Sequence, residues 1–216
     1  MIEVPKPRDG CPWAFYEPST PFRFAVLILH TSTNQIPDLA AELHRHNLAA
    51  CVPSAPDGWW VKDAEKHVVE SVLPWMRERW KLGPRSIAVV GVEAGGQGAV
   101  RLGFKYPDSF PVVASLDGAF DFHDLYGEGT PLDGLYPSRE RARQDTAILN
   151  IDPYKVPPHI WFACDPESEW FRGNDRLVEK LNAYGIAHTA DLAGAKPGAM
   201  IEFAAKALHS VSRKLM

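Results

Sequence analysis

This chain of 216 residues has few cysteines, no long apolar run and no excess of positive charge. Each of these features argues against a class of protein. Three cysteines at unrelated spacings argue against a disulfide framework or a zinc knuckle. The longest apolar run of the buried type, residues 24–29, is far too short to cross a bilayer. The 23 basic and 27 acidic side chains are interleaved, so there is no basic stripe of the kind that binds nucleic acids or membrane surfaces. We therefore expect a small-molecule ligand or a protein partner, with no nucleic acid and no membrane.

The composition is typical of one globular domain, with 45% hydrophobic and 11% aromatic residues. No internal repeat or linker divides the chain, so we expect a single domain over residues 1–216. Residues 1–10 lead into no apolar segment of the kind a secretion signal needs, which favours a cytoplasmic location. No motif indicates a cofactor or a metal, and we expect neither. Cys51 and Cys164 lie in or beside apolar runs and are predicted to be core residues.

Apolar runs alternate with segments of helical period along the chain. The predicted strands are residues 23–29, 48–52, 86–92, 112–116, 160–164 and 186–192, and the predicted helices are residues 38–46, 63–82, 98–106, 174–184 and a C-terminal segment after Gly198. Residues 1–21 are predicted to be extended or looped, and residues 120–158 to be irregular with one short helix. Near-continuously apolar strands that alternate with helices indicate a mostly parallel α/β sheet covered on both faces.

The motif that stands out is Gly91-Val-Glu-Ala-Gly95, which we call the elbow, between a predicted strand and a predicted helix. Its spacing is that of G-x-S-x-G, in which glycines permit a tight, strained turn that lifts the central side chain above the sheet. Here the central residue is Glu93 instead of serine.

The elbow and its surroundings resemble the serine esterases of the α/β-hydrolase fold, in particular the esterase D and S-formylglutathione hydrolase group. The resemblance covers most of the chain and is most specific in Leu73-Pro-Trp, in Arg85-Ser-Ile-Ala-Val-Val-Gly-Val-Glu-Ala-Gly-Gly-Gln-Gly-Ala-Val and in Lys105-Tyr-Pro-Asp-Ser-Phe. It implies the α/β-hydrolase fold, a mostly parallel twisted sheet with helices on both faces and no large cap domain.

The same resemblance implies where a catalytic triad would stand, and this chain departs from it at each position. The nucleophile falls on Glu93, the acid near Ser168 and the histidine at about Lys196. A shift of register makes Glu167 or Glu169 the acid, but no histidine occurs between His188 and His209. A hydroxyl nucleophile needs a positioned base, usually histidine, so the expected esterase chemistry lacks its main parts.

An oxyanion pocket is expected to survive, because its donors are backbone N–H groups, that of Ala94 and one from the loop of His30 and Thr31. A carboxylate at a helix N-terminus is favoured in its charged form. We hypothesise that Glu93 fills this pocket itself or pairs with Lys196.

Alternative site residues remain open. Asp117 with His123 is the second choice for an acid and base, although an Asp-Gly turn also explains Asp117. Asp165, Glu167 and Glu169 form an acidic cluster that is more typical of a solvated loop than of a cation site. Trp59 and Trp60 either line a pocket or cap the core.

Two functional hypotheses follow from these residues. The first is a pseudo-esterase that keeps the scaffold as a binding or partner protein. The second is an active carboxylic-ester hydrolase with an unconventional site built on Glu93. The absence of both nucleophile and base favours the first.

Overall fold

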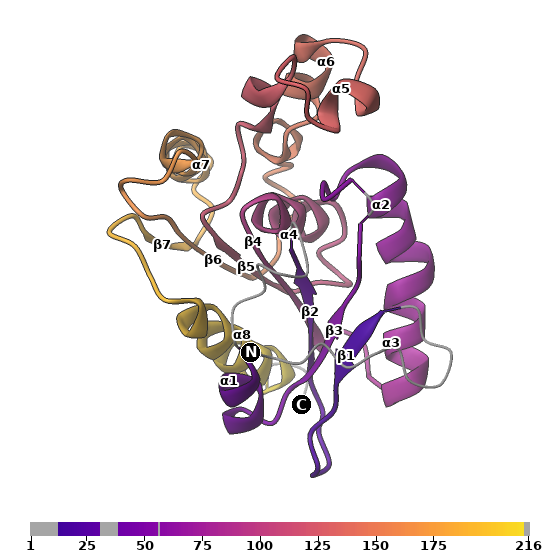
Figure 1. Ribbon diagram of the computed structural model, residues 1–216. Helices are drawn as coiled ribbons and strands as arrows, with labels where there is room; N and C mark the ends of the chain where they lie inside the picture. Colours follow the sequence, from indigo (N-terminus) through magenta and orange to yellow (C-terminus); the bar gives the residue numbers. More distant parts are fainter. Residues whose placement is uncertain (1–12, 31–38, 56, 214–216) are drawn as a thin grey trace.

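A twisted sheet forms the centre of the computed structural model, which describes residues 13–30, 39–55 and 57–213 (Figure 1). In this part of the chain the sheet has seven strands in the order β1-β3-β2-β4-β5-β6-β7. β1 is antiparallel to β3, and every other neighbouring pair is parallel. The strands are β1 (Ala14–Tyr16), β2 (Ala25–Leu29), β3 (Ala49–Val52), β4 (Ile87–Val92), β5 (Val112–Leu116), β6 (His159–Ala163) and β7 (Thr189–Asp191).

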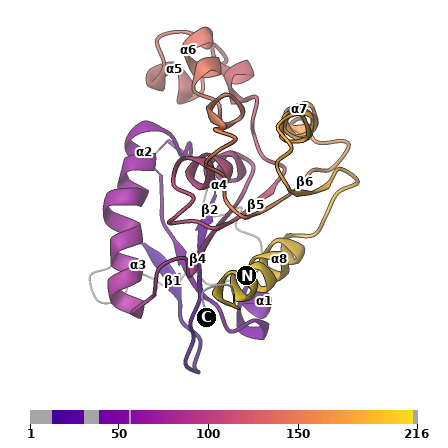
Figure 2. The same ribbon diagram turned by 180° about the vertical axis from the view of Figure 1, so that it is seen from behind.

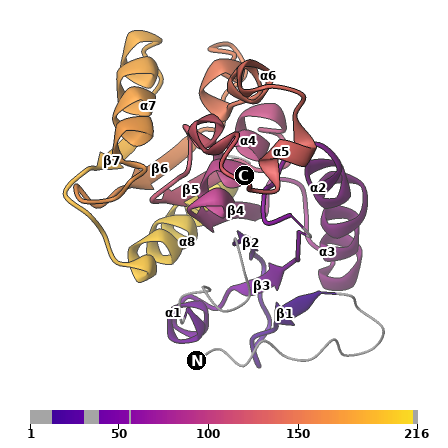
Figure 3. The ribbon, with the colours of Figure 1, turned by 45° about the horizontal axis from the view of Figure 1, so that its top comes forward.

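Helices cover both faces of this sheet, as predicted (Figures 2 and 3). One face packs against α1 and α8 through a cluster that includes Val26, Ala88 and Leu208, and the other packs against α3, α4 and α7 through Leu27, Val89 and Leu102. Neighbouring strand residues thus point to opposite cores, which is why the strands are apolar throughout. The helices are α1 (Ala40–Arg45), α2 (Lys62–His67), η2 (Val68–Val72), α3 (Leu73–Trp80), α4 (Ala94–Lys105), η3 (Phe122–Leu125), α5 (Leu132–Leu135), α6 (Arg139–Gln144), η4 (Ala147–Asn150), α7 (Phe171–Ala183) and α8 (Pro197–Arg213).

The long helix predicted over residues 63–82 is present but contains a π-helical turn, η2, between α2 and α3. Pro74 lies directly after this turn, and proline has no N–H to donate to the carbonyl four residues back. The missing hydrogen bond accounts for the local change of helical pitch.

Several segments differ from the prediction, among them α4, which begins at Ala94 and not at residue 98. Residues 14–16 form β1, which exists because β3 offers an edge to pair with. The segment over residues 120–158 contains η3, α5, α6 and η4 instead of one short helix, each too short to show a hydrophobic period. α7 begins at Phe171, earlier than predicted, and β7 is shorter than predicted.

No helix within the described residues is long and apolar enough to cross a membrane.

Candidate functional site

The predicted strand–turn–helix at the elbow is confirmed. β4 ends at Val92, α4 begins at Ala94, and Glu93 between them has φ 52° and ψ −118°. This conformation is strained for a residue with a side chain, at a cost of about 1–3 kcal/mol, and persists only where the surroundings hold it. Here the Glu93 N–H donates to the Leu116 carbonyl at 2.9 Å, and its carbonyl accepts from Ala119 N at 3.0 Å.

The glycines of the elbow allow the backbones to approach closely. A Cβ on Gly91 would lie 2.1 Å from the Gly95 carbonyl oxygen, and a Cβ on Gly95 would lie 2.1 Å from the Leu29 carbonyl oxygen. No side chain fits at either position. The end of β2 and the start of α4 therefore meet directly beside Glu93.

The parallel register places the elbow and the loops of Ser168 and Lys196, the three predicted catalytic positions, at the carboxyl ends of the strands. Val92 lies opposite Leu116, Leu116 opposite Ala163, and Ala163 opposite Asp191. The loops that follow β6 and β7 thus leave the sheet on the same side as the elbow. They also touch one another, since a Cβ on Gly194 would lie 3.5 Å from Asp165 Cα.

The loop after β6 uses its polar side chains to form a turn. Ser168 N donates to the Asp165 carbonyl at 3.0 Å, and Ser168 Oγ accepts from Trp170 N at 3.2 Å. Asp165 Oδ1 accepts from Glu167 N at 2.9 Å. Within the described ranges, no group of three or more His, Cys, Asp or Glu residues is arranged to hold a metal ion. The carboxylate of Asp165 therefore helps to form the turn of this loop.

Lys196, at the predicted histidine position, is exposed in the loop between β7 and α8. Among the ion pairs of residues 13–30, 39–55 and 57–213, none joins Lys196 to Glu93. Pairing of Glu93 with Lys196 therefore stays a prediction. Occupation of the oxyanion pocket stays a prediction, because Thr31 lies outside the described residues.

His30 lies at the end of β2 and is buried. Its backbone carbonyl accepts a hydrogen bond from Trp60 Nε1 at 3.1 Å, and the two rings meet edge to face with centroids 6.4 Å apart. Trp60 is itself fully buried against Gly98. Trp59 is also buried, with its ring centroid 5.4 Å from that of Phe122. Both tryptophans are thus core residues that support the elbow.

Asp117 and His123 are not brought together as an acid and base pair. Asp117 Oδ1 accepts from Asp165 N at 2.8 Å, whereas His123 Nε2 lies 3.6 Å from Asp124 Oδ1. Burial lowers the pKa of His123 more than the nearby carboxylates of Asp124 and Asp121 raise it. The buried environment of His123 therefore favours the neutral form of its ring.

A buried ionic network behind the elbow is not predicted by the sequence analysis. Arg101 on α4 donates to Glu65 on α2 and, at 2.8 Å, to Asp145 after α6. Lys105 Nζ lies 2.7 Å from Glu65 Oε1, and Tyr136 Oη donates to Asp145 at 2.7 Å. The network joins α4 and α2 to the segment over residues 120–158. Its signal in the sequence is Arg101 in a helix of mostly small and apolar residues, because an arginine buried there requires an acid nearby.

Cys164 is expected to resist alkylation in the folded protein. Burial, with a contribution from the Asp117 carboxylate, raises its pKa to about 12, and only the thiolate is a good nucleophile. Peptide-resolved mass spectrometry after iodoacetamide treatment at about pH 8 should show Cys164 unmodified in native protein and fully modified in denaturant. Rapid modification of the native protein would contradict this environment.

Solved structures of esterases share this overall arrangement of sheet and helices. The serine hydrolase FphF of Staphylococcus aureus, described as fluorophosphonate-binding, superposes with a TM-score of 0.69 and 13% identity over 92% of this chain and 91% of that one. S-formylglutathione hydrolase FrmB from Staphylococcus aureus superposes with a TM-score of 0.67 and 14% identity, over 92% of this chain and 91% of that one. The S-formylglutathione hydrolase from Agrobacterium tumefaciens superposes with a TM-score of 0.65 and 12% identity, over 93% of this chain and 87% of that one. The chain has the α/β-hydrolase fold.

The predicted α/β-hydrolase fold is therefore confirmed by structure. No protein-family model and no curated protein sequence matches the chain. At such low identity the likeness concerns the fold, and the chemistry has to be argued from the site itself.

Proposed function

We propose that this protein is a pseudo-esterase, an α/β-hydrolase-fold protein that has exchanged catalysis for binding a small molecule or a protein partner. The observation that carries the proposal is Glu93 at the strained elbow, at φ 52° and ψ −118°, where the fold would present a serine. The neighbouring loops carry Ser168 and Lys196 where the resemblance implies an acid and a histidine.

The distribution of histidines supports this proposal, because acyl transfer by a hydroxyl needs a base within hydrogen-bond reach. His188 precedes β7, and its ring is stacked on Phe162 with centroids 5.7 Å apart. His209 lies in α8, with its ring 4.8 Å from that of Phe24 before β2. Both are thus held by packing at places other than the loop after β7.

The test is a comparison of the wild-type protein with Glu93→Ala and Glu93→Ser, using p-nitrophenyl acetate and a fluorophosphonate probe. We expect none of the three proteins to hydrolyse the ester above the protein-free rate. Glu93→Ser should not be labelled by the probe, because the loop after β7, where the resemblance implies the base, carries no histidine.

The second hypothesis, an active hydrolase built on Glu93, makes the opposite prediction. Turnover by the wild-type protein that Glu93→Ala abolishes would establish it and overturn the proposal. Strong labelling of Glu93→Ser would also count against the proposal, since it would reveal a functional base. Circular dichroism of each variant should confirm that all three proteins are folded.

A further inference from the structure

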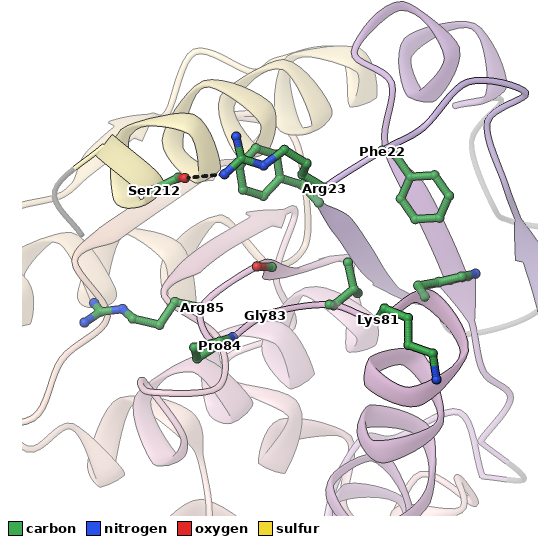
Figure 4. A pocket seen from close by; sticks show the side chains of 11 residues that line it. Phe22, Arg23, Lys81, Gly83, Pro84, Arg85 and Ser212 are labelled. Atoms are coloured by element: carbon green, nitrogen blue, oxygen red, sulfur yellow. Dashed lines mark hydrogen bonds between the residues drawn. The ribbon is translucent and has the colours of Figure 1, made fainter. Parts of the chain in front are cut away.

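A second candidate site lies at the amino ends of β2 and β4, whereas the elbow lies at the carboxyl end of β4 (Figure 4). It is a cavity of about 360 Å³. Beside the cavity, Ala25 N donates a hydrogen bond to the Ser86 carbonyl at 3.1 Å and so joins the first residues of β2 and β4. β4 (Ile87–Val92) separates the cavity from Glu93, a span of roughly 17 Å.

Three cations and no carboxylate line this cavity. Arg23 lies on one side, and Lys81 and Arg85 extend in opposite directions from the two ends of the loop on the other (Figure 4). Within the described part of the chain, none of these three residues forms an ion pair. The nearby carboxylate of Glu17 is held by Arg79 and Trp80. The cavity therefore has a net positive field that no side chain of the described residues neutralises.

Hydrogen-bonding capacity is also left over at the cavity. Arg23 makes a single long hydrogen bond, 3.3 Å from its Nη2 to Ser212 Oγ, and Arg85 Nε is buried without a partner among the described residues. Guanidinium groups with unused donors are suited to the oxygens of a phosphate. A bound oxyanion would satisfy these donors.

The backbone holds two of the cations in an uncommon conformation. Lys81 has φ 51° and Arg85 has φ 63°, in the left-handed region that glycine and asparagine adopt more readily. Leu82 N donates to the Arg77 carbonyl at 3.1 Å and fixes the start of the loop. The loop thus carries charged side chains at two positions where glycine or asparagine would cost less.

Aromatic side chains supply a second, apolar surface. Phe22 and Trp80 line the cavity and meet edge to face, with ring centroids 6.0 Å apart. The volume lies within the range of small-molecule sites and exceeds what one inorganic oxyanion needs. We propose that this pocket binds a small organic phosphate ester, with its phosphate held by the guanidinium groups of Arg23 and Arg85 and its apolar body against Phe22 and Trp80.

The test is isothermal titration of the full-length protein with phenyl phosphate as the probe. We expect saturable binding that weakens with added salt, and tighter binding than for inorganic phosphate because the ring adds apolar contact. Absence of saturation up to ~10 mM phenyl phosphate would overturn the proposal. Equal affinity for both probes would overturn the part of it that concerns the aromatic wall.

Lys81→Asn and Arg85→Asn separate binding from folding, because asparagine fits a left-handed backbone. The double variant should bind phenyl phosphate at least ~10-fold more weakly without a fall in melting temperature. The control Arg172→Gln removes one positive charge, as each of the two substitutions does, at an exposed position on α7 and should change the affinity less than ~2-fold. Unchanged affinity in the double variant would exclude this pocket as the site.

Glu93→Ala should leave phenyl phosphate binding unchanged, because Glu93 lies at the other edge of the sheet. A loss of binding in Glu93→Ala would place the phosphate at the elbow and contradict the proposal. The ester-hydrolysis experiment does not depend on this outcome, so the two proposals can fail separately.

Discussion

Replacing Gly95 with alanine is expected to lower the free energy of unfolding by more than ~3 kcal/mol. The new Cβ would lie 2.1 Å from the Leu29 carbonyl oxygen and 2.7 Å from the His30 nitrogen. Both are backbone atoms where β2 ends beside the elbow, so relief requires a shift of β2 or α4 instead of a side-chain rotation. Urea denaturation followed by circular dichroism measures the change.

Gly134→Ala is the matched control for this substitution. A Cβ at Gly134 meets nothing within 4 Å, and the residue lies exposed on α5. Alanine there should be neutral or stabilising by up to ~1 kcal/mol, because it reduces the conformational freedom of the unfolded chain. Similar stabilities for Gly95→Ala and Gly134→Ala would contradict the close approach of β2 and α4.

Replacing Arg101 with methionine is expected to cost about 3–5 kcal/mol of stability, the range for breaking a buried ion pair by removing one partner. Glu65 is only 5% exposed and Arg101 only 3%. Without Arg101, the Glu65 carboxylate would keep Lys105 and Tyr106 as partners, and Asp145 would lose its guanidinium. Urea denaturation at neutral pH provides the measurement.

A second substitution tests whether the loss of stability in Arg101→Met comes from the buried charge of Glu65 that has lost its arginine. Glu65→Met combined with Arg101→Met removes both buried ions, and the double variant should be more stable than Arg101→Met alone. Arg143→Gln breaks only the exposed pair with Glu140 and should cause no measurable change. A double variant that is less stable than Arg101→Met would contradict this explanation.

The same network makes the free energy of unfolding depend on pH. Burial raises the pKa of Glu65, but the hydrogen bonds and charges of Lys105 and Arg101 outweigh it and lower the pKa below its ordinary value. A carboxyl whose pKa is lower in the folded state stabilises the protein above its unfolded pKa, and this contribution is lost as the pH falls through the folded value. The wild-type protein should therefore lose more stability on acidification than the double variant does.

Much of the fold could be predicted from the chain because its signals are local. The apolar run 86–92 followed by glycines indicates a buried strand and a sharp turn, and the structure has β4 and the strained Glu93 there. β1 was not predicted because its three residues become a strand only by pairing with β3. The helices of the segment over residues 120–158 are too short for a periodic signal, so only their packing reveals them.

The sequence by itself determined which chemical groups are available: a glutamate at the elbow, and neither a serine there nor a histidine between His188 and His209. Tertiary structure decided which groups meet. The parallel register aligned the ends of β4, β5, β6 and β7. Asp117 accepts a hydrogen bond from Asp165 N, and His123 lies beside Asp124. Arg23, Lys81 and Arg85 are brought around one cavity only because β2 and β4 are neighbours in the sheet. Such contacts join residues far apart in the chain and depend on packing, which no local sequence pattern encodes.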